Sequence, residues 1–104
     1  MFSTVHQQSQ HLRLLSQHTF DSTEVATKFT TWLQQIPALS QVRCEQGLDV
    51  IEIRFWFQSE SFYGHYEHYS ESFWIDTDSV GALMLLSELA ETLEKHIEQT
   101  IESI

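Results

Sequence analysis

The sequence has few of the residues on which cross-links, phosphate-binding loops and membrane spans depend. Its 104 residues include one cysteine, three glycines and one proline. A single cysteine excludes an intramolecular disulfide, and three glycines leave no glycine-rich loop to hold a phosphate group. No stretch approaches the ~18 consecutive apolar residues of a membrane-spanning helix, and the N-terminus lacks the basic and apolar segments of a signal peptide. We therefore expect a soluble, cytoplasmic protein.

Positive charge is scarce as well. Five lysines and arginines stand against fifteen aspartates and glutamates, and the formal net charge is −10. The acids gather in residues 60–104, which hold ten of them against Lys95 alone. Such a surface repels phosphate backbones and anionic lipids, so we expect no binding to nucleic acid or to a membrane. A basic protein partner is compatible with this charge, although acidity alone also keeps a protein soluble.

The composition is that of a folded protein, with 41% hydrophobic and 12% aromatic residues. Its length suits a single domain, residues 1–104, whose core needs no disulfide or metal to hold it. Residues 1–10 are polar, and we expect them to form a loose end. Residues 11–18 contain three leucines and are compatible with a first strand or with a short helix.

The residues between 49 and 76 organise the rest of the chain. Residues 50–57 alternate between apolar side chains and a second set that mixes charge with tryptophan, as a half-buried strand does. The apolar set, which we expect to face the core, comprises Ile51, Ile53, Phe55 and Phe57. Residues 62–69 and 72–76 resume the strand pattern after polar turns, which predicts an antiparallel meander. Both faces of 62–69 carry aromatic residues, so the pattern does not decide which face is buried.

Two stretches have the apolar spacing of amphipathic helices. Residues 21–36 repeat apolar side chains on one helical face, including Trp32, and Pro37 ends the helix. Residues 79–102 form a longer helix, and residues 39–45 alternate weakly, like a further strand. The sequence therefore predicts an α+β fold: an antiparallel sheet of four to five strands with two helices packed on one face, in the order β-α-β-β-β-β-α.

The predicted C-terminal helix is longer than the strands that it covers. Twenty-odd residues span about 35 Å at roughly 1.5 Å each, whereas strands of six to eight residues span about 20–27 Å. The end that carries Ile97, Ile101 and Ile104 therefore overhangs the sheet and needs a cover. A second copy of the chain supplies that cover in a homodimer, and residues 12–15 supply it in the alternative.

The sequence contains no recognisable catalytic or metal-binding motif. On a strand His65 and Glu67 share one face while His68 points to the other, so the three do not form a ligand set. Nothing near Cys44 activates it as a nucleophile, and a lone cysteine is most often a small buried hydrophobic residue. We therefore predict no catalytic residues, no metal and no cofactor, and lean against an enzyme.

The second face of the predicted sheet is the strongest candidate for function. If the helices cover the apolar face, Trp56 and Trp74 stand on the other side with Arg54, together with Tyr63 or Tyr66. Aromatic and arginine side chains are favoured in protein interfaces. The alternative is that the rings pack on one another, with the arginine stacked across one of them. The predicted binding residues are Arg54, Trp56, Tyr66 and Trp74.

Three functions are compatible with these features. The leading hypothesis is a non-enzymatic protein-interaction domain that uses the aromatic sheet face or the acidic helix. The second is an inhibitor that mimics nucleic acid and occupies the basic site of its target. The third is a small enzyme with an unrecognised site. Binding that survives high salt favours the aromatic face, whereas strong salt sensitivity favours the mimic.

Three parts of the central and C-terminal sequence resemble a known family. They are the run from Ile53 to Phe57, the run from Glu67 to Ile75, and the leucine-rich helix from Leu83 to Leu93. Together they are similar to a small bacterial family of about this chain length that is catalogued only as a domain of unknown function. The resemblance covers residues 48–93, and its motif is an acidic and aromatic strand pair ending in Ser-x-Trp/Phe. It implies a bacterial, cytosolic, compact α+β domain and carries over no catalytic residue.

Overall fold

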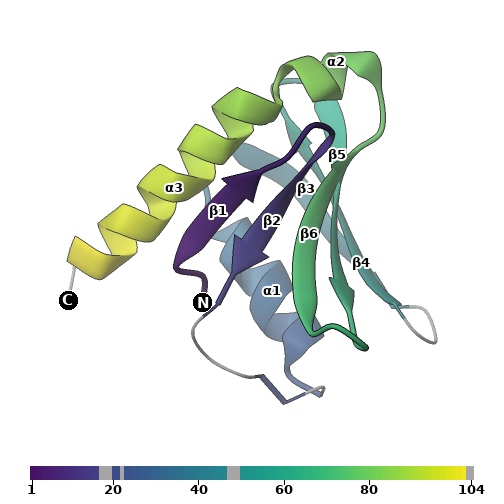
Figure 1. Ribbon diagram of the computed structural model, residues 1–104, viewed down its shortest axis with the longest axis vertical. Helices are drawn as coiled ribbons and strands as arrows, with labels where there is room; N and C mark the ends of the chain where they lie inside the picture. Colours follow the sequence, from purple (N-terminus) through teal and green to yellow (C-terminus); the bar gives the residue numbers. More distant parts are fainter. Residues whose placement is uncertain (17–19, 22, 47–49, 103–104) are drawn as a thin grey trace.

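The computed structural model describes residues 1–16, 20, 21, 23–46 and 50–102 (Figure 1). Within them the chain forms a six-stranded sheet and three helices, which confirms the α+β class and adds strands to the predicted four to five. The elements in chain order are β1 (Thr4–Gln7), β2 (His11–Leu15), α1 (Val25–Gln34), β3 (Leu39–Gln46), β4 (Val50–Phe57), β5 (Glu60–Glu67), β6 (Ser72–Thr77), α2 (Val80–Met84) and α3 (Leu86–Glu102).

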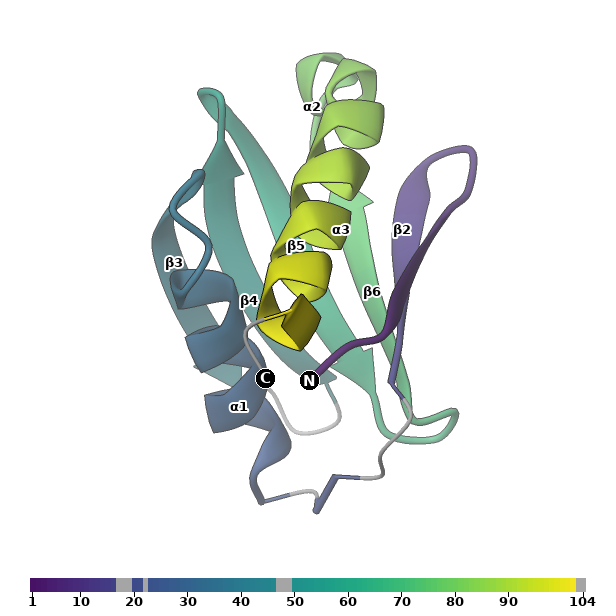
Figure 2. The same ribbon diagram turned by 90° about the vertical axis from the view of Figure 1, so that its left-hand side faces the viewer.

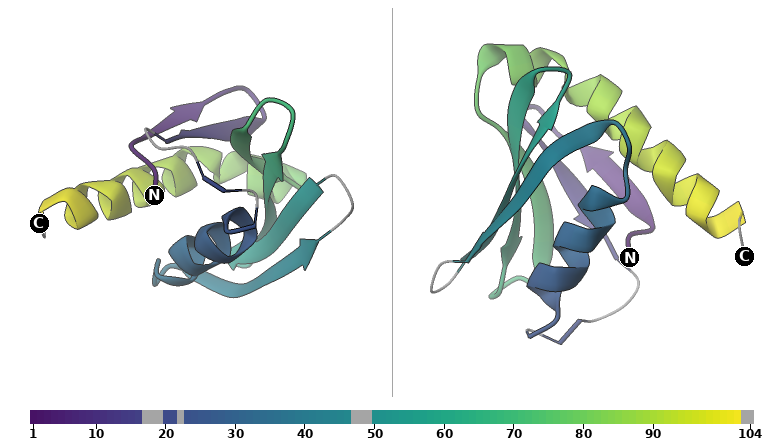
Figure 3. Two further views of the ribbon diagram at one scale, coloured as in Figure 1. Left: turned by 90° about the horizontal axis from the view of Figure 1, so that it is seen from below. Right: turned by 180° about the vertical axis from the view of Figure 1, so that it is seen from behind.

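The strands lie in the order β1-β2-β6-β5-β4-β3, and every neighbouring pair is antiparallel. β4 to β6 form the predicted meander, and β3 pairs with β4 as the further strand that the sequence suggested. The N-terminal hairpin β1–β2 adds to the other side through the pairing of β2 with β6. The sheet curls around α1 and α3, which both lie on its inner face (Figures 2 and 3). No helix of the described chain covers its outer face, as the sequence predicted.

The prediction of a loose N-terminus is wrong, because β1 pairs with β2 along its whole length. Phe2 and Val5 are each only 6% exposed. The Phe2 ring packs edge-on against Phe29, Trp32 and Phe73, with ring centroids 5.5, 4.7 and 4.8 Å away. Two buried side chains, with Met1 packed beside the core, thus anchor a segment whose other residues are polar. Residues 11–15 are a strand rather than a helix, and residues 17–19 of the same stretch lie outside the described residues.

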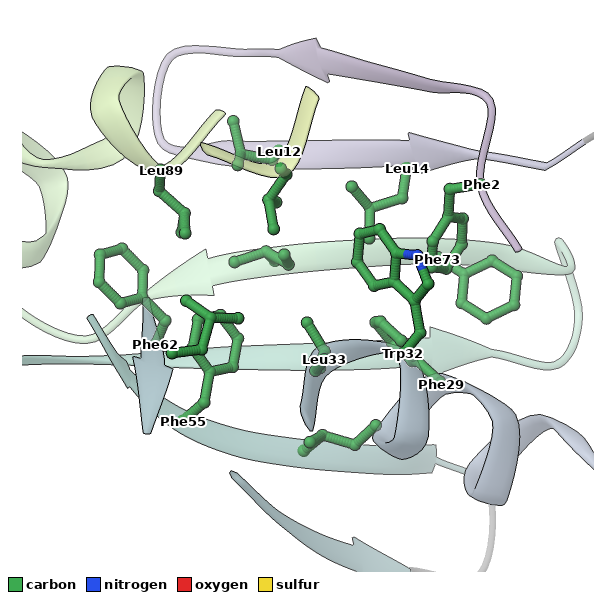
Figure 4. Close-up of a cluster of buried hydrophobic side chains, with 14 of the residues drawn as sticks. Phe2, Leu12, Leu14, Phe29, Trp32, Leu33, Phe55, Phe62, Phe73 and Leu89 are labelled. Atoms are coloured by element: carbon green, nitrogen blue, oxygen red, sulfur yellow. The ribbon is translucent and has the colours of Figure 1, made fainter. Parts of the chain in front are cut away.

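The inner face of the sheet carries the core (Figure 4). The four apolar residues of β4 that were expected to face inward are all buried, which confirms the alternation. α1 supplies Phe29, Trp32 and Leu33, and α3 supplies Leu89 from the other side. α1 begins at Val25 rather than 21, because the Asp21 carboxylate accepts hydrogen bonds from the amide and hydroxyl of Thr23 in a separate turn. These two bonds also lower the pKa of Asp21.

β5 starts two residues earlier than predicted, because the hairpin turn before it is tight. Only Gln58 and Ser59 connect Phe57 to its partner Glu60, and both have positive φ angles, 49° and 67°. Positive φ at both central residues matches the twist of paired strands. The β4–β5 register then runs without a break past Gly64, so that glycine marks no bulge. A Cβ atom there would lie 3.1 Å from the Phe29 ring, so Gly64 makes room for α1.

The single C-terminal helix predicted over 79–102 is divided in two at Leu85. Ser79 caps α2 by accepting a hydrogen bond from the Ala82 amide, and the Leu85 amide closes the last turn on the Ala82 carbonyl. The division lets α2 pack on β5 and β6 while α3 runs along β1 and β2. Among the described residues, no helix is long and apolar enough to cross a membrane.

The far end of α3 extends past the strands (Figure 1). Ile97 is nevertheless 5% exposed, and it borders a small hollow together with Ser3, Thr4 and Val5. Its cover therefore includes the start of the chain rather than residues 12–15 alone. The side chains of Ile101 and Ile104 lie outside the described residues. The homodimer stays a prediction, and a monomer in light scattering well above micromolar concentration would contradict it.

Candidate functional site

Three of the four predicted binding residues lie on the outer face of the sheet. Arg54 and Trp56 alternate along β4 with buried residues, and Trp74 does the same on β6. Tyr66 does not join them. It is 5% exposed and belongs to the inner face, where its ring meets Phe73 at 4.7 Å. Tyr63, the other tyrosine considered for the outer face, lies there instead, because β5 buries the face that contains Phe62 and Gly64.

Trp56 is the most accessible tryptophan of this face, at 37% exposure. Its neighbours in register are Ser40 on β3 and Ser61 on β5. Both flanking side chains are short, so the indole stands above them, and in the part of the chain that the structure describes no other ring packs against it. Trp56 thus has the geometry of an anchor for another molecule.

Trp74 is packed by its own protein. The Arg13 guanidinium lies over its ring at 5.4 Å from the centroid, and His11 meets it edge-on at 4.8 Å. The indole nitrogen donates a 2.8 Å hydrogen bond to the Ser72 hydroxyl. A cation over an indole and a satisfied N–H both hold the ring in place. Trp74 is therefore stacked within its own protein, as the alternative prediction had it, and the stacking arginine is Arg13 rather than Arg54.

Arg54 instead pairs with Tyr63, its neighbour in register on β5. The guanidinium lies 4.6 Å from the ring centroid and donates a 2.6 Å hydrogen bond to the phenol oxygen. Desolvation is the largest cause that raises the pKa of Tyr63, and a hydrogen bond to Asp78 adds to it, while Arg54 acts in the opposite direction. The phenol therefore stays protonated at neutral pH, and its one O–H donates to the Asp78 carboxylate while its oxygen accepts from Arg54.

The Asp76 carboxylate lies between two histidines of this face. Its oxygens are 2.5 Å from His65 Nε2 and 3.7 Å from His11 Nδ1. Asp76, His65, Tyr63 and Glu52 line a shallow hollow of about 270 Å³. Sequence reasoning missed this group. Alternation along β5 and β6 was enough to place His65 and Asp76 on one face, whereas His11 joins them only through the long-range pairing of β2 with β6.

The other residues considered for chemistry are far less organised. Cys44 is exposed on β3, in a groove lined otherwise by Ala26, Thr27, Thr30, Thr31 and Gln34 of α1. None of these side chains is a base that activates a thiol. Over the described stretches of chain, no three histidine, cysteine or acidic residues are placed to hold a metal ion.

A family model described as "Protein of unknown function (DUF3630)" matches residues 2–95. The match extends well beyond the residues that carried the resemblance, because it includes the N-terminal hairpin and α1. No curated protein and no solved structure matches the chain.

Proposed function

The chain belongs to this family, whose description assigns no activity, and we propose from the geometry of the sheet that it is a non-enzymatic protein-interaction domain. The partner binds the outer face of the sheet, with Trp56 as the anchor and Arg54 beside it. The observation that carries this proposal is the gathering of arginine and tryptophan on that face of an otherwise acidic chain. All three arginines of the sequence, Arg13, Arg43 and Arg54, are exposed there on β2, β3 and β4.

The arrangement of these arginines supports a partner with carboxylate groups. Arg43 and Arg54 stand opposite each other in the register of β3 and β4. Like charges at opposed positions of a sheet repel one another. Neither forms an ion pair with a described acidic side chain. Carboxylates of a partner would relieve this repulsion while the partner covers the Trp56 ring, and tryptophan and arginine together are typical of the residues that dominate binding energy.

The test is capture of a partner from a bacterial lysate by the tagged chain, at low and at high salt. Trp56→Ala removes the anchor, and Glu91→Gln/Glu94→Gln on α3 is the matched control, because it changes only exposed acidic positions away from the outer face. We expect a partner that the wild type and the control retain at both salt concentrations and that Trp56→Ala loses. Retention by Trp56→Ala would contradict the proposal.

A second candidate function follows from α3, whose exposed side carries Glu88, Glu91, Glu94 and Glu98. Here the acidic helix mimics nucleic acid and occupies a basic site on its target. Binding of that kind weakens steeply with salt, because it depends on long-range charge attraction. Capture that fails for Glu91→Gln/Glu94→Gln and at high salt, but persists for Trp56→Ala, would favour this candidate over the first.

A further inference from the structure

A small pocket opens at the end of the sheet where β2 and β6 separate. The two strands pair from His11 with Asp76 as far as Leu14 with Phe73. The next residue, Leu15, pairs with β1 and has no register partner on β6. The gap beyond this point is a pocket of about 230 Å³. Since strand residues alternate between faces, its lining comes from both faces of the sheet: Tyr66 and Phe73 from the inner one, Arg13 and Ser72 from the outer one.

Tyr66 places a hydroxyl group in this pocket without a protein partner. The residue is 95% buried, since 5% of it is exposed, and in the described chain no hydrogen bond engages its hydroxyl. Burial is the larger cause that raises the pKa of Tyr66, and the negative charge of Glu71 is the other. In the described chain the buried side-chain oxygens without a partner are Thr30 Oγ1 and Ser61 Oγ, and the Tyr66 hydroxyl is not one of them, so it is open to the pocket. A molecule in the pocket can therefore take the hydrogen bond that no protein group makes.

Two opposite charges border the same pocket. Arg13 contributes from β2, and Glu71 contributes from the turn between β5 and β6, where it has a left-handed backbone with φ of 52°. That conformation is unfavourable for a residue with a side chain, so the turn holds Glu71 at some cost in energy. Within the described residues neither Arg13 nor Glu71 forms an ion pair. The pocket lining thus includes a cation, whose guanidinium also lies over the Trp74 ring, and an anion, neither of them in an ion pair within the described chain.

The remaining walls supply hydroxyl groups and aromatic rings. Ser70 and Ser72 share a 2.6 Å hydrogen bond between their hydroxyls, and Ser72 also accepts the bond from the Trp74 indole. Phe20 and Phe73 supply apolar surface. The volume lies below the ~300 Å³ at which pockets for drug-sized ligands begin. A matching ligand is therefore small, carries both charges and has an apolar part.

We propose that this pocket binds a free α-amino acid with an apolar side chain. The Arg13 guanidinium takes the carboxylate, for which its paired N–H groups are suited, and the Glu71 carboxylate takes the ammonium group. The Tyr66 hydroxyl completes its hydrogen bonding with the ligand, and the ligand side chain lies against Phe20 and Phe73. The outer-face anchor Trp56 has no part in this site, so the inference does not rest on the proposed function.

The hydrogen bond from Trp74 to Ser72 provides a local readout. The full-length chain is labelled with ¹⁵N, and its indole N–H signals are followed by NMR while one apolar L-amino acid after another is added at millimolar concentration. We expect a saturable shift of the Trp74 signal, because Ser72 lines the pocket, and no shift of Trp56. The deaminated acid and the decarboxylated amine of the same amino acid are expected to bind at least about tenfold more weakly, because each lacks one charged partner.

Two variants connect the shift to the pocket. Arg13→Gln is expected to weaken binding about tenfold or more, and Tyr66→Phe is expected to weaken it while keeping the ring. Their matched controls on the outer face are Arg54→Gln and Tyr63→Phe, which should bind as the wild type does. If Arg13→Gln does not fold, Glu71→Gln at the exposed turn replaces it. A chain that shows no saturable shift with any amino acid, a shift that survives both variants, or equal binding of the deaminated acid would overturn the proposal.

Discussion

Replacing Gly64 by alanine places a methyl group where the ring of Phe29 already lies. The added carbon would be 3.1 Å from the tip of that ring and 3.5 Å from Leu33. Carbon atoms pack best at about 3.5–4.0 Å, so the ring has to move by a few tenths of an ångström. Phe29 is fully buried and sits at 5.1 Å from the Phe73 ring and 5.5 Å from the Phe2 ring, which leaves it little freedom to yield.

Two effects of opposite sign set the magnitude of this change. Alanine restricts the unfolded chain more than glycine does, which stabilises a protein by about 0.4–1 kcal/mol where the backbone permits it. Overpacking a well-filled core costs about 1–3 kcal/mol. Because Phe29 is held on several sides, we expect the second effect to win. Gly64→Ala should then lower the free energy of unfolding by about 0.5–2 kcal/mol, with a fall in Tm of about 4–8 °C for each kcal/mol.

The assay is urea unfolding followed by circular dichroism, applied to the wild type, Gly64→Ala, Phe29→Leu and the double variant. Phe29→Leu alone leaves a cavity and should cost about 1–2 kcal/mol. In the double variant the alanine methyl occupies part of that cavity. The double variant should therefore lose about 0.5–1 kcal/mol less stability than the sum of the losses of the two single variants. A Gly64→Ala protein as stable as the wild type, or strictly additive losses, would refute the reasoning that α1 requires a glycine here.

Three further outcomes are expected from other parts of the molecule. Trp56→Ala should change the free energy of unfolding by less than about 0.5 kcal/mol in urea, whereas Trp74→Ala should cost about 1 kcal/mol or more because the packed ring is lost. His96 should titrate below 6.5 by NMR, since burial chiefly and the chain's amino terminus secondarily lower its pKa. His96 therefore binds a proton more readily in the unfolded chain than in the folded one. Its contribution to the free energy of unfolding is complete above pH 6.5, and it is lost as the pH falls from 6.5 toward the lower pKa of the folded state. In Gly81→Ala the new carbon would collide with the Glu60 carboxylate, and the flexible acid should swing away at a cost below about 1 kcal/mol. Calorimetry should show no such loss in a Glu60→Ala background.

The spacing of apolar residues correctly predicted which face is buried in elements where only one face is apolar. The alternation of residues 50–57 assigned the buried face of β4, and the helical spacing around Trp32 placed that ring in the core. The spacing did not decide the buried face where both faces of a strand carry apolar rings. Residues 62–69 carry aromatic rings on both faces, so the burial of Tyr66 depends on which side α1 covers, and that is a tertiary fact.

The candidate site divides in the same way. The outward positions of Arg54 and Trp56 follow from the alternation of side chains along β4. The stacking of Arg13 on Trp74 and the approach of His11 to Asp76 both require β2 to pair with β6, which are far apart in the sequence. No local signal specifies that pairing. The N-terminal strand was missed for a similar reason, since a few buried side chains hold an otherwise polar segment.

The attachment of the N-terminal hairpin to β6 has a consequence for synthesis. As the nascent chain leaves the ribosome, β1 and β2 emerge first, but the strand that receives them emerges after β3, β4 and β5. The N-terminal hairpin can therefore dock only after β6 is made, and until then the edge of β2 that carries Leu12 and Leu14 lacks its partners Ile75 and Phe73. Pairings between distant segments slow folding and prolong the exposure of apolar surface. The N-terminal hairpin therefore keeps one strand edge unpaired until late in synthesis.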